Sequence, residues 1–97
     1  MTSYRFSSEA NSDVAEILHY LFELNPAAAR RFLETLDEKC DLLVRNPQLG
    51  RSRPAIAEGL RSFPAGNYLI FYVIAPDGIL VVRIIYGGRD LPGMLEN

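Results

Sequence analysis

The sequence contains very little cysteine, histidine, lysine or tryptophan: one, one, one and none among its 97 residues. Cys40 has no partner for an internal disulfide, and one cysteine with one histidine cannot form a Cys/His zinc site. We therefore expect no metal and no cofactor. Cys40 also falls on the apolar face of an expected helix, where a buried thiol acts as a small hydrophobic residue.

Long apolar runs are also absent. No stretch approaches the roughly 18 apolar residues of a membrane span, and the first residues lack the apolar core of a signal peptide. The length is that of one small domain, able to bury an ordinary core. We expect one domain over residues 1–97, cytoplasmic and without a membrane association.

Charge is unevenly distributed along the chain, although the net charge is only −2. The first 44 residues carry eight acidic residues, whereas residues 45–90 carry six arginines against three acidic residues. The small net negative charge argues against a general electrostatic hold on nucleic acid. The pattern predicts an acidic helical half and a basic sheet half.

Apolar spacing predicts two helices in the first half. A short strand at residues 4–6 precedes a helix with Ser7 or Ser8 as N-cap, which should end near residues 24–25 because Pro26 follows. Asn25 and Pro26 suit the N-cap and first position of a second helix, which Asn46-Pro47 ends. The short connection predicts an antiparallel helix hairpin. The expected apolar faces are Val14, Ile17, Leu18, Leu21 and Phe22 in the first helix, and Ala29, Phe32, Leu33, Leu36, Cys40, Leu43 and Val44 in the second.

The second half alternates with the period of strands. After a loop at 47–59, a strand begins around 60–63, a turn follows at 64–67, and two long strands follow at about 68–75 and 79–86. Short connections predict a three-stranded antiparallel meander. The fold class is thus α+β, with a short N-terminal strand and a helix hairpin packed on one sheet face. Residues 87–97 read as an irregular tail that we expect to be mobile.

Both faces of the long strands are apolar, as in a sheet covered on both sides. Leu69, Phe71 and Val73 occupy one face of their strand. Strict alternation places Val81, Arg83 and Ile85 together in the next strand. A helix hairpin can cover one face only. The tail and long loop could cover the other, but we favour a partner chain, since small domains rarely expose large apolar patches.

The arginines are the main candidate for chemistry. No Ser/His/Asp triad, paired-carboxylate site or phosphate loop is evident, and His19 reads as a helix-surface residue. Arg61 and Arg83 lie on strands of the meander, and Arg89 lies just beyond it. Their planar guanidinium groups suit phosphate or carboxylate recognition. Arg83 could instead form a structural ion pair with Glu58 or Asp90.

Six segments, in order, resemble the ParE/RelE superfamily of bacterial type II toxin–antitoxin toxins, a group associated with plasmid stabilisation. They begin with Tyr4-Arg-Phe-Ser, Asn25-Pro-Ala-Ala-Ala-Arg-Arg-Phe and Asn46-Pro-Gln-Leu-Gly-Arg. Gly59-Leu-Arg-Ser-Phe, Tyr68-Leu-Ile-Phe-Tyr and Arg83-Ile-Ile-Tyr-Gly-Gly-Arg-Asp follow. The resemblance covers nearly the whole chain. It implies a cognate antitoxin, ParD-like or similar, whose C-terminal segment wraps the toxin in a hetero-oligomer.

Two branches of the superfamily differ in target. RelE-like members cleave messenger RNA on the ribosome with converging basic side chains, whereas ParE-like members are reported to inhibit DNA gyrase. In the RelE pattern an arginine directly follows the tyrosine of the middle strand, but here Tyr68 is followed by Leu69. The RelE pattern also includes lysines on the preceding strand and a tyrosine in the C-terminal tail, and this sequence has neither. Only Arg89 matches, so the resemblance favours the ParE branch, although Tyr86 stands where histidine is common there.

The leading prediction is therefore a ParE-like toxin that binds and inhibits gyrase. A metal-independent endoribonuclease built on Arg61, Arg83 and Arg89 is the alternative, and a non-toxic partner-binding domain is a second one. For the target-binding surface we predict Arg61, Arg83, Tyr86 and Arg89. For the antitoxin interface we predict Leu69, Phe71, Val73 and Val81, or their opposite-face neighbours, with exposed parts of the helix hairpin.

Overall fold

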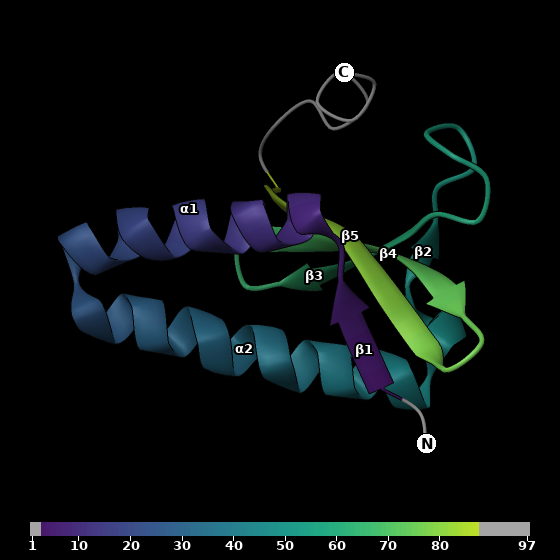
Figure 1. Ribbon diagram of the computed structural model, residues 1–97, viewed down its shortest axis with the longest axis horizontal. Coiled ribbons are helices and arrows are strands. Elements are labelled where there is room, and N and C mark those ends of the chain that lie inside the picture. Colours follow the sequence, from purple (N-terminus) through teal and green to yellow (C-terminus); the bar gives the residue numbers. More distant parts are fainter. Residues whose placement is uncertain (1–2, 88–97) are drawn as a thin grey trace.

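A computed structural model describes residues 3–87 as two helices packed on a five-stranded sheet. The elements are β1 (Ser3–Phe6), α1 (Ser8–Leu24), α2 (Pro26–Arg45), a short 3₁₀ helix η1 (Pro47–Leu49), β2 (Arg51–Ser52), β3 (Arg61–Ala65), β4 (Tyr68–Ala75) and β5 (Gly78–Tyr86). Figure 1 shows the two helices lying side by side along one side of the sheet. The expected α+β class is confirmed. No helix in residues 3–87 is long and apolar enough to cross a membrane.

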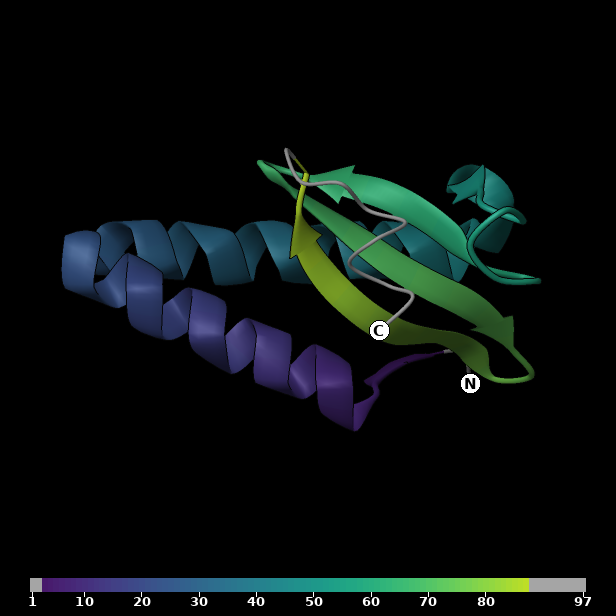
Figure 2. The same cartoon turned by 90° about the horizontal axis from the view of Figure 1, so that it is seen from above.

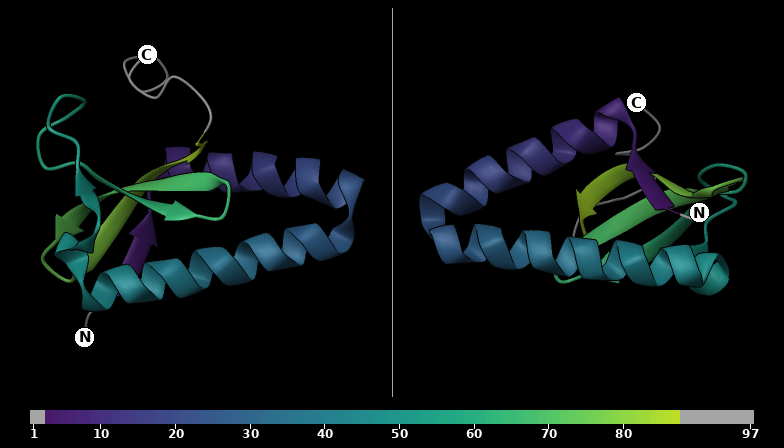
Figure 3. Two further views of the ribbon diagram at one scale, coloured as in Figure 1. Left: turned by 180° about the vertical axis from the view of Figure 1, so that it is seen from behind. Right: turned by 60° about the horizontal axis from the view of Figure 1, so that its bottom comes forward.

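The helix boundaries follow the capping signals in the sequence. The Ser7 side chain accepts a hydrogen bond from the backbone of Ala10, and Asn25 caps α2 through Ala27, with Pro26 at the first helical position. The cap residue Asn25 is also the whole connection between the helices, so the two must turn back on each other. Figures 2 and 3 (right) show the helices diverging from this connection toward the sheet.

The closed end of the hairpin extends past the sheet (Figures 1 and 2). Phe22, expected on the core-facing side, is instead 62% exposed. The prediction was wrong because the helix outruns the sheet there, leaving nothing for that ring to pack against. Val14, Ile17, Leu18 and Leu21 do pack against the main core.

The sheet order is β1-β5-β4-β3-β2. The three long strands form the expected antiparallel meander, and β1 joins it by pairing in parallel with the first half of β5. Two details differ from expectation. The loop after α2 contains the short strand β2, and the turn is only Gly66-Asn67, so Pro64 belongs to β3. Proline is tolerated there because β2 pairs only with residues 61–62, leaving the rest of β3 at an edge.

Two apolar clusters lie on the two faces of the sheet. The main core joins the helices to residues such as Ile70, Tyr72 and Val81. The second holds Leu60, Phe71 and Ile85, with Ile56, Leu69, Val73 and Val82 packed around them. Ile56 and Leu60 come from the segment before β3, so that loop provides part of the cover on the second face.

Candidate functional site

Arg83 is held in a bidentate ion pair with Asp13 of α1. Its Nε and one terminal nitrogen donate to the two carboxylate oxygens at 2.8 and 3.1 Å. The same carboxylate accepts the backbone N–H of Ile84 at 2.9 Å. The hydrogen bond to Asp13 raises the pKa of the Arg83 guanidinium. Arg83 is therefore an anchor between α1 and β5. Among residues 3–87 its partner is Asp13 and not Glu58, which the sequence suggested, whereas Asp90 lies outside the described residues.

The local topology explains this anchor. β1 pairs with β5 only as far as Val81, although β5 continues to Tyr86. An edge strand beyond that point presents unpaired backbone groups. The start of α1 supplies partners for them: the Ser7 hydroxyl donates to the Val82 carbonyl, and Asp13 accepts from Ile84. Asp13 thus completes the edge of β5 as well as neutralising Arg83.

A groove runs between α1 and this end of β5, with a volume of about 630 Å³. We call it the tyrosine groove. Tyr68 packs edge-on against Tyr86 with ring centroids 5.8 Å apart. Burial, with nearby Tyr20 and Tyr86, raises the pKa of Tyr68. Tyr20 and Tyr86 are 60% and 49% exposed. The groove is lined by Asp13, Glu16, Ile17, Tyr20, Tyr68, Arg83, Ile84, Ile85 and Tyr86.

Arg61 lies in a separate network. Its guanidinium donates to the carbonyls of Gln48 and Gly50 at 3.1 and 2.8 Å. Tyr72, fully buried, holds the same turn: its hydroxyl donates to the Pro47 carbonyl and accepts from the Gly50 N–H. Arg61 and Tyr72 therefore fix the turn after α2 against the sheet. This role for Tyr72 could not be predicted, because Tyr72 stands in the sequence as one more residue of an apolar strand.

The two predicted arginines that the structure describes, Arg61 and Arg83, do not converge on one point. Arg61 and Arg83 stand on β3 and β5, with β4 between them, a separation of two strand spacings or roughly 10 Å between backbones. The two guanidinium groups have different hydrogen-bond partners, the Gly50 carbonyl for Arg61 and the Asp13 carboxylate for Arg83. Tyr86 shares the tyrosine groove with Arg83. Arg89 lies outside the described residues, as does the tail beyond Gly87.

The residues predicted for antitoxin binding divide between the two sheet faces. Leu69, Phe71 and Val73 belong to the second cluster, whereas Val81 is buried in the main core. A β-bulge is the reason: Phe71 pairs with Arg83 but Tyr72 pairs with Val81, so Val82 is one residue extra. A bulge shifts the alternation by one. Placing Val81 on the Phe71 face was therefore wrong.

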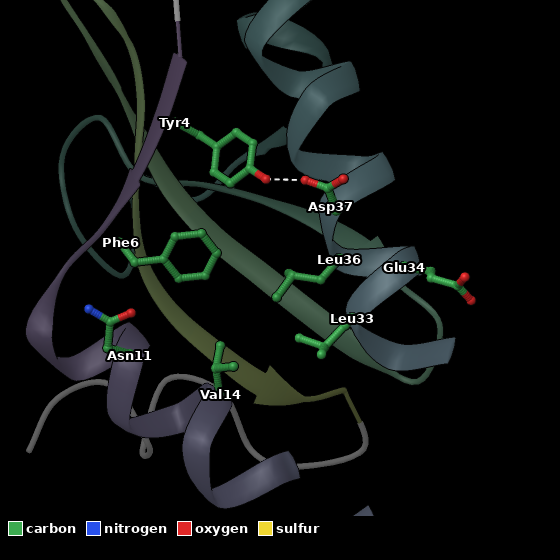
Figure 4. A pocket seen from close by; sticks show the side chains of 8 residues that line it. All are labelled: Tyr4, Phe6, Asn11, Val14, Leu33, Glu34, Leu36 and Asp37. Atoms are coloured by element: carbon green, nitrogen blue, oxygen red, sulfur yellow. Dashed lines mark hydrogen bonds between the residues drawn. The ribbon is translucent and has the colours of Figure 1, made fainter. Parts of the chain in front are cut away.

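A second groove lies between β1 and the diverging helices, with a volume of about 510 Å³. We call it the β1 groove. Figure 4 shows Tyr4 and Phe6 of β1 facing α2 across it. The Tyr4 hydroxyl donates a hydrogen bond to Asp37, and this bond, together with burial, raises the pKa of Tyr4. The groove is lined by Tyr4, Phe6, Asn11, Val14, Leu33, Glu34, Leu36 and Asp37. The β1 groove could not be predicted from the sequence, because it arises from the divergence of the helices.

Neither groove resembles a metal centre. Within residues 3–87, no group of three or more His, Cys, Asp or Glu side chains is placed to hold a metal ion. Cys40 is buried, and burial is the main cause that raises the pKa of its thiol to about 12. A thiol in that environment is not an activated nucleophile.

Comparison with known proteins identifies the family. A family model described as the ParE toxin of the type II toxin–antitoxin system parDE matches residues 4–91. Toxin RelE3 of Caulobacter vibrioides is 27% identical over 85 residues, covering 87% of this chain and 92% of that protein. A structure of the chromosomal ParDE TA system from P. aeruginosa shares the fold, with a TM-score of 0.70 and 21% identity over 89% of this chain and 96% of that one. The chain therefore belongs to the ParE toxin family of type II toxin–antitoxin systems.

Proposed function

We propose that this chain is a bacterial toxin that acts in the cytoplasm by binding DNA gyrase and is held inactive by a cognate antitoxin. The observation that carries the proposal is the match to the ParE toxin model over residues 4–91. One solved structure with this fold is of a ParDE system, which supports an antitoxin partner for this chain too.

The arrangement of the basic residues supports inhibition by binding. Stabilising the oxyanion of a cleaved phosphodiester needs several donors aimed at one point. Among the described residues, Arg83 is committed to Asp13 and Arg61 to two backbone carbonyls. A bidentate pair resists replacement by a substrate phosphate because the freed Asp13 would remain 12% exposed and without its cation.

We assign the target-binding residues two kinds of role on this basis. Tyr86 is half exposed at the rim of the tyrosine groove, where an aromatic side chain can serve as a contact residue. Arg89 follows it closely in sequence and is our second contact residue. Arg83 positions β5, the strand that leads to both contact residues, by anchoring it to α1, and Arg61 holds the turn after α2 against the sheet.

The competing function is ribosome-dependent cleavage of messenger RNA. One relative is named Toxin RelE3, and this name supports that alternative. It would require Arg61, Arg83 and Arg89 to act on one phosphate. A non-toxic, partner-binding domain is the third possibility, and harmless overexpression without the antitoxin would favour it.

A supercoiling assay with purified toxin tests the proposal. We expect gyrase supercoiling to fall with increasing toxin and to recover when the antitoxin is added in equimolar amount. Tyr86→Ala should weaken inhibition, whereas Phe22→Ala, which removes an exposed aromatic ring outside the groove, is the matched control and should leave inhibition unchanged. Gyrase that remains fully active at a large toxin excess would count decisively against the proposal.

A further inference from the structure

The tyrosine groove borders the part of β5 that β1 does not cover. β1 pairs with the first half of β5 only, and α1 lies beside the rest of the strand (Figure 1). Tyr86 lies opposite Tyr68 of β4, and the Gly87 N–H donates to the Asn67 carbonyl. Because backbone groups alternate between the two edges of a strand, those of Ile84 and Tyr86 point away from β4 and toward the groove.

Oxygen acceptors line both walls of the groove. The Ile84 N–H is already bonded to Asp13, whereas the carbonyls of Ile84 and Tyr86 lie on the open edge, where no strand within residues 3–87 pairs with β5. Glu16 adds an exposed carboxylate one turn after Asp13 on α1. Arg83 is the one cation of the lining, and it is paired with Asp13. The lining therefore favours a cationic ligand that can donate several hydrogen bonds.

Three tyrosine rings surround the same space. Burial and then the neighbouring Tyr20 and Tyr86 raise the pKa of Tyr68, so all three phenol groups lie near one another. Tyr20 on α1 and Tyr86 on β5 keep much of their surface exposed. Glu16 precedes Tyr20 by four residues, so the carboxylate and the ring share one face of α1. Aromatic faces attract cations, and a planar guanidinium stacks on them better than the strongly hydrated ammonium of lysine.

We propose that the tyrosine groove binds an arginine side chain of gyrase, held by Tyr20, Tyr86 and Glu16. The guanidinium stacks on the exposed rings, donates to the Glu16 carboxylate and reaches the open carbonyls of β5. This inference rests on the proposed function, because it takes gyrase as the partner and names the chemistry that Tyr86 recognises. A phosphate or an acidic segment is disfavoured, since the carboxylates of the groove would repel it.

Titration of the full chain with N-acetyl-arginine amide, followed by NMR of the aromatic rings, tests the groove itself. We expect the ring signals of Tyr20 and Tyr86 to shift as the probe is added, and those of Phe22, outside the groove, to stay in place. N-acetyl-citrulline amide has nearly the same shape without the charge, so it should bind at least about tenfold more weakly. Equal responses to the two probes, or no response to either, overturn the guanidinium site.

Supercoiling assays with toxin variants test the partner. Glu16→Gln and Tyr20→Ala should each raise the toxin concentration needed for half inhibition of gyrase by about tenfold, equivalent to about 1.4 kcal/mol. The matched controls are Glu23→Gln and Phe22→Ala, which change an exposed carboxylate and an exposed ring outside the groove. Each control should change that concentration by less than about twofold. The substituted side chains are all exposed, and circular dichroism of each variant checks that it is folded.

The outcomes separate this inference from the function on which it rests. Wild-type toxin that inhibits gyrase, with Glu16→Gln and Tyr20→Ala equally potent, overturns the arginine site and leaves the proposed function intact. Wild-type toxin that does not inhibit gyrase at all overturns both. If the two variants bind the antitoxin more weakly than the wild type but inhibit gyrase equally well, the groove serves the antitoxin and the assignment to gyrase is wrong. The titration needs no variant, so it stands even if a variant fails to fold.

Discussion

Removing the carboxylate of Asp13 should destabilise the fold through three hydrogen bonds at once. Asp13→Ala deprives Arg83 of both bidentate contacts and leaves the Ile84 N–H without its acceptor. The Asp13 side chain is only 12% exposed, whereas that of Arg83 is 30% exposed. Water can therefore reach the freed guanidinium more easily than it can replace the carboxylate at the strand edge.

The magnitude follows from these contacts. An unsatisfied buried N–H costs about 1–3 kcal/mol, and a hydrogen bond to a charged group contributes about 1.5–3 kcal/mol. Because Arg83 is partly hydrated after the change, we expect a total loss of about 2–4 kcal/mol rather than the full sum. For a domain of this size that lowers Tm by roughly 10–25 °C. Asp13→Asn keeps an acceptor for Ile84 and should lose about half as much.

Urea denaturation followed by circular dichroism measures this loss. Glu16→Ala is the control, since Glu16 lies on the same helix, is exposed and should change the free energy of unfolding by less than about 0.5 kcal/mol. If Asp13→Ala also costs less than about 0.5 kcal/mol, the anchor contributes nothing measurable. Arg83 would then be free to bind a target, and the reasoning against a converging arginine site would fail.

Three further predictions concern the sheet and the core. Gly78 has φ +143°, and a Cβ there would overlap the backbone of Ser3. Gly78→Ala should therefore lower the free energy of unfolding by at least about 2 kcal/mol. Rapid hydrogen exchange of the Arg5 amide in this variant would show that β1 has detached, and a wild-type exchange rate would refute the prediction. Tyr72→Phe removes the bonds to Pro47 and Gly50 and should cost about 1–3 kcal/mol in thermal denaturation, with Tyr20→Phe unchanged as the control. Burial keeps Cys40 neutral in the fold up to a pKa of about 12, above its ordinary value of 9.0. The unfolded chain therefore loses that proton first, and the free energy of unfolding should fall between about pH 9 and 12. The free energy of unfolding of Cys40→Ala should fall less between about pH 9 and 12. If the wild type and Cys40→Ala show the same pH dependence of that free energy, the thiol is not the titrating group.

The helices were largely predictable from the sequence because their signals are local. Ser7, Asn25 and Pro26 define helix starts through side-chain and backbone chemistry within three residues. The apolar spacing identified the buried faces except at Phe22, where the hairpin extends past the sheet, and at Leu33, which is 44% exposed beside the β1 groove. The exposure of Phe22 depends on how far the sheet extends, which no window of α1 contains.

The site was less predictable because it depends on pairings between distant residues. Asp13 and Arg83 are 70 residues apart, and nothing in the neighbourhood of either residue indicates the other. The bulge at Val82 is equally hidden, since the sequence around it alternates like any strand. One extra residue moved Val81 into the main core and divided the predicted antitoxin surface between two faces.

We propose DNA gyrase as the target of this toxin. The most direct test is one preparation assayed in parallel for inhibition of gyrase supercoiling and for cleavage of messenger RNA on programmed ribosomes. We expect supercoiling to be inhibited at toxin concentrations near that of gyrase, inhibition to be relieved by the antitoxin, and the message to remain intact. Cleavage of the message at defined sites, abolished by Arg89→Ala, together with undisturbed gyrase activity, would contradict a toxin that acts by binding gyrase.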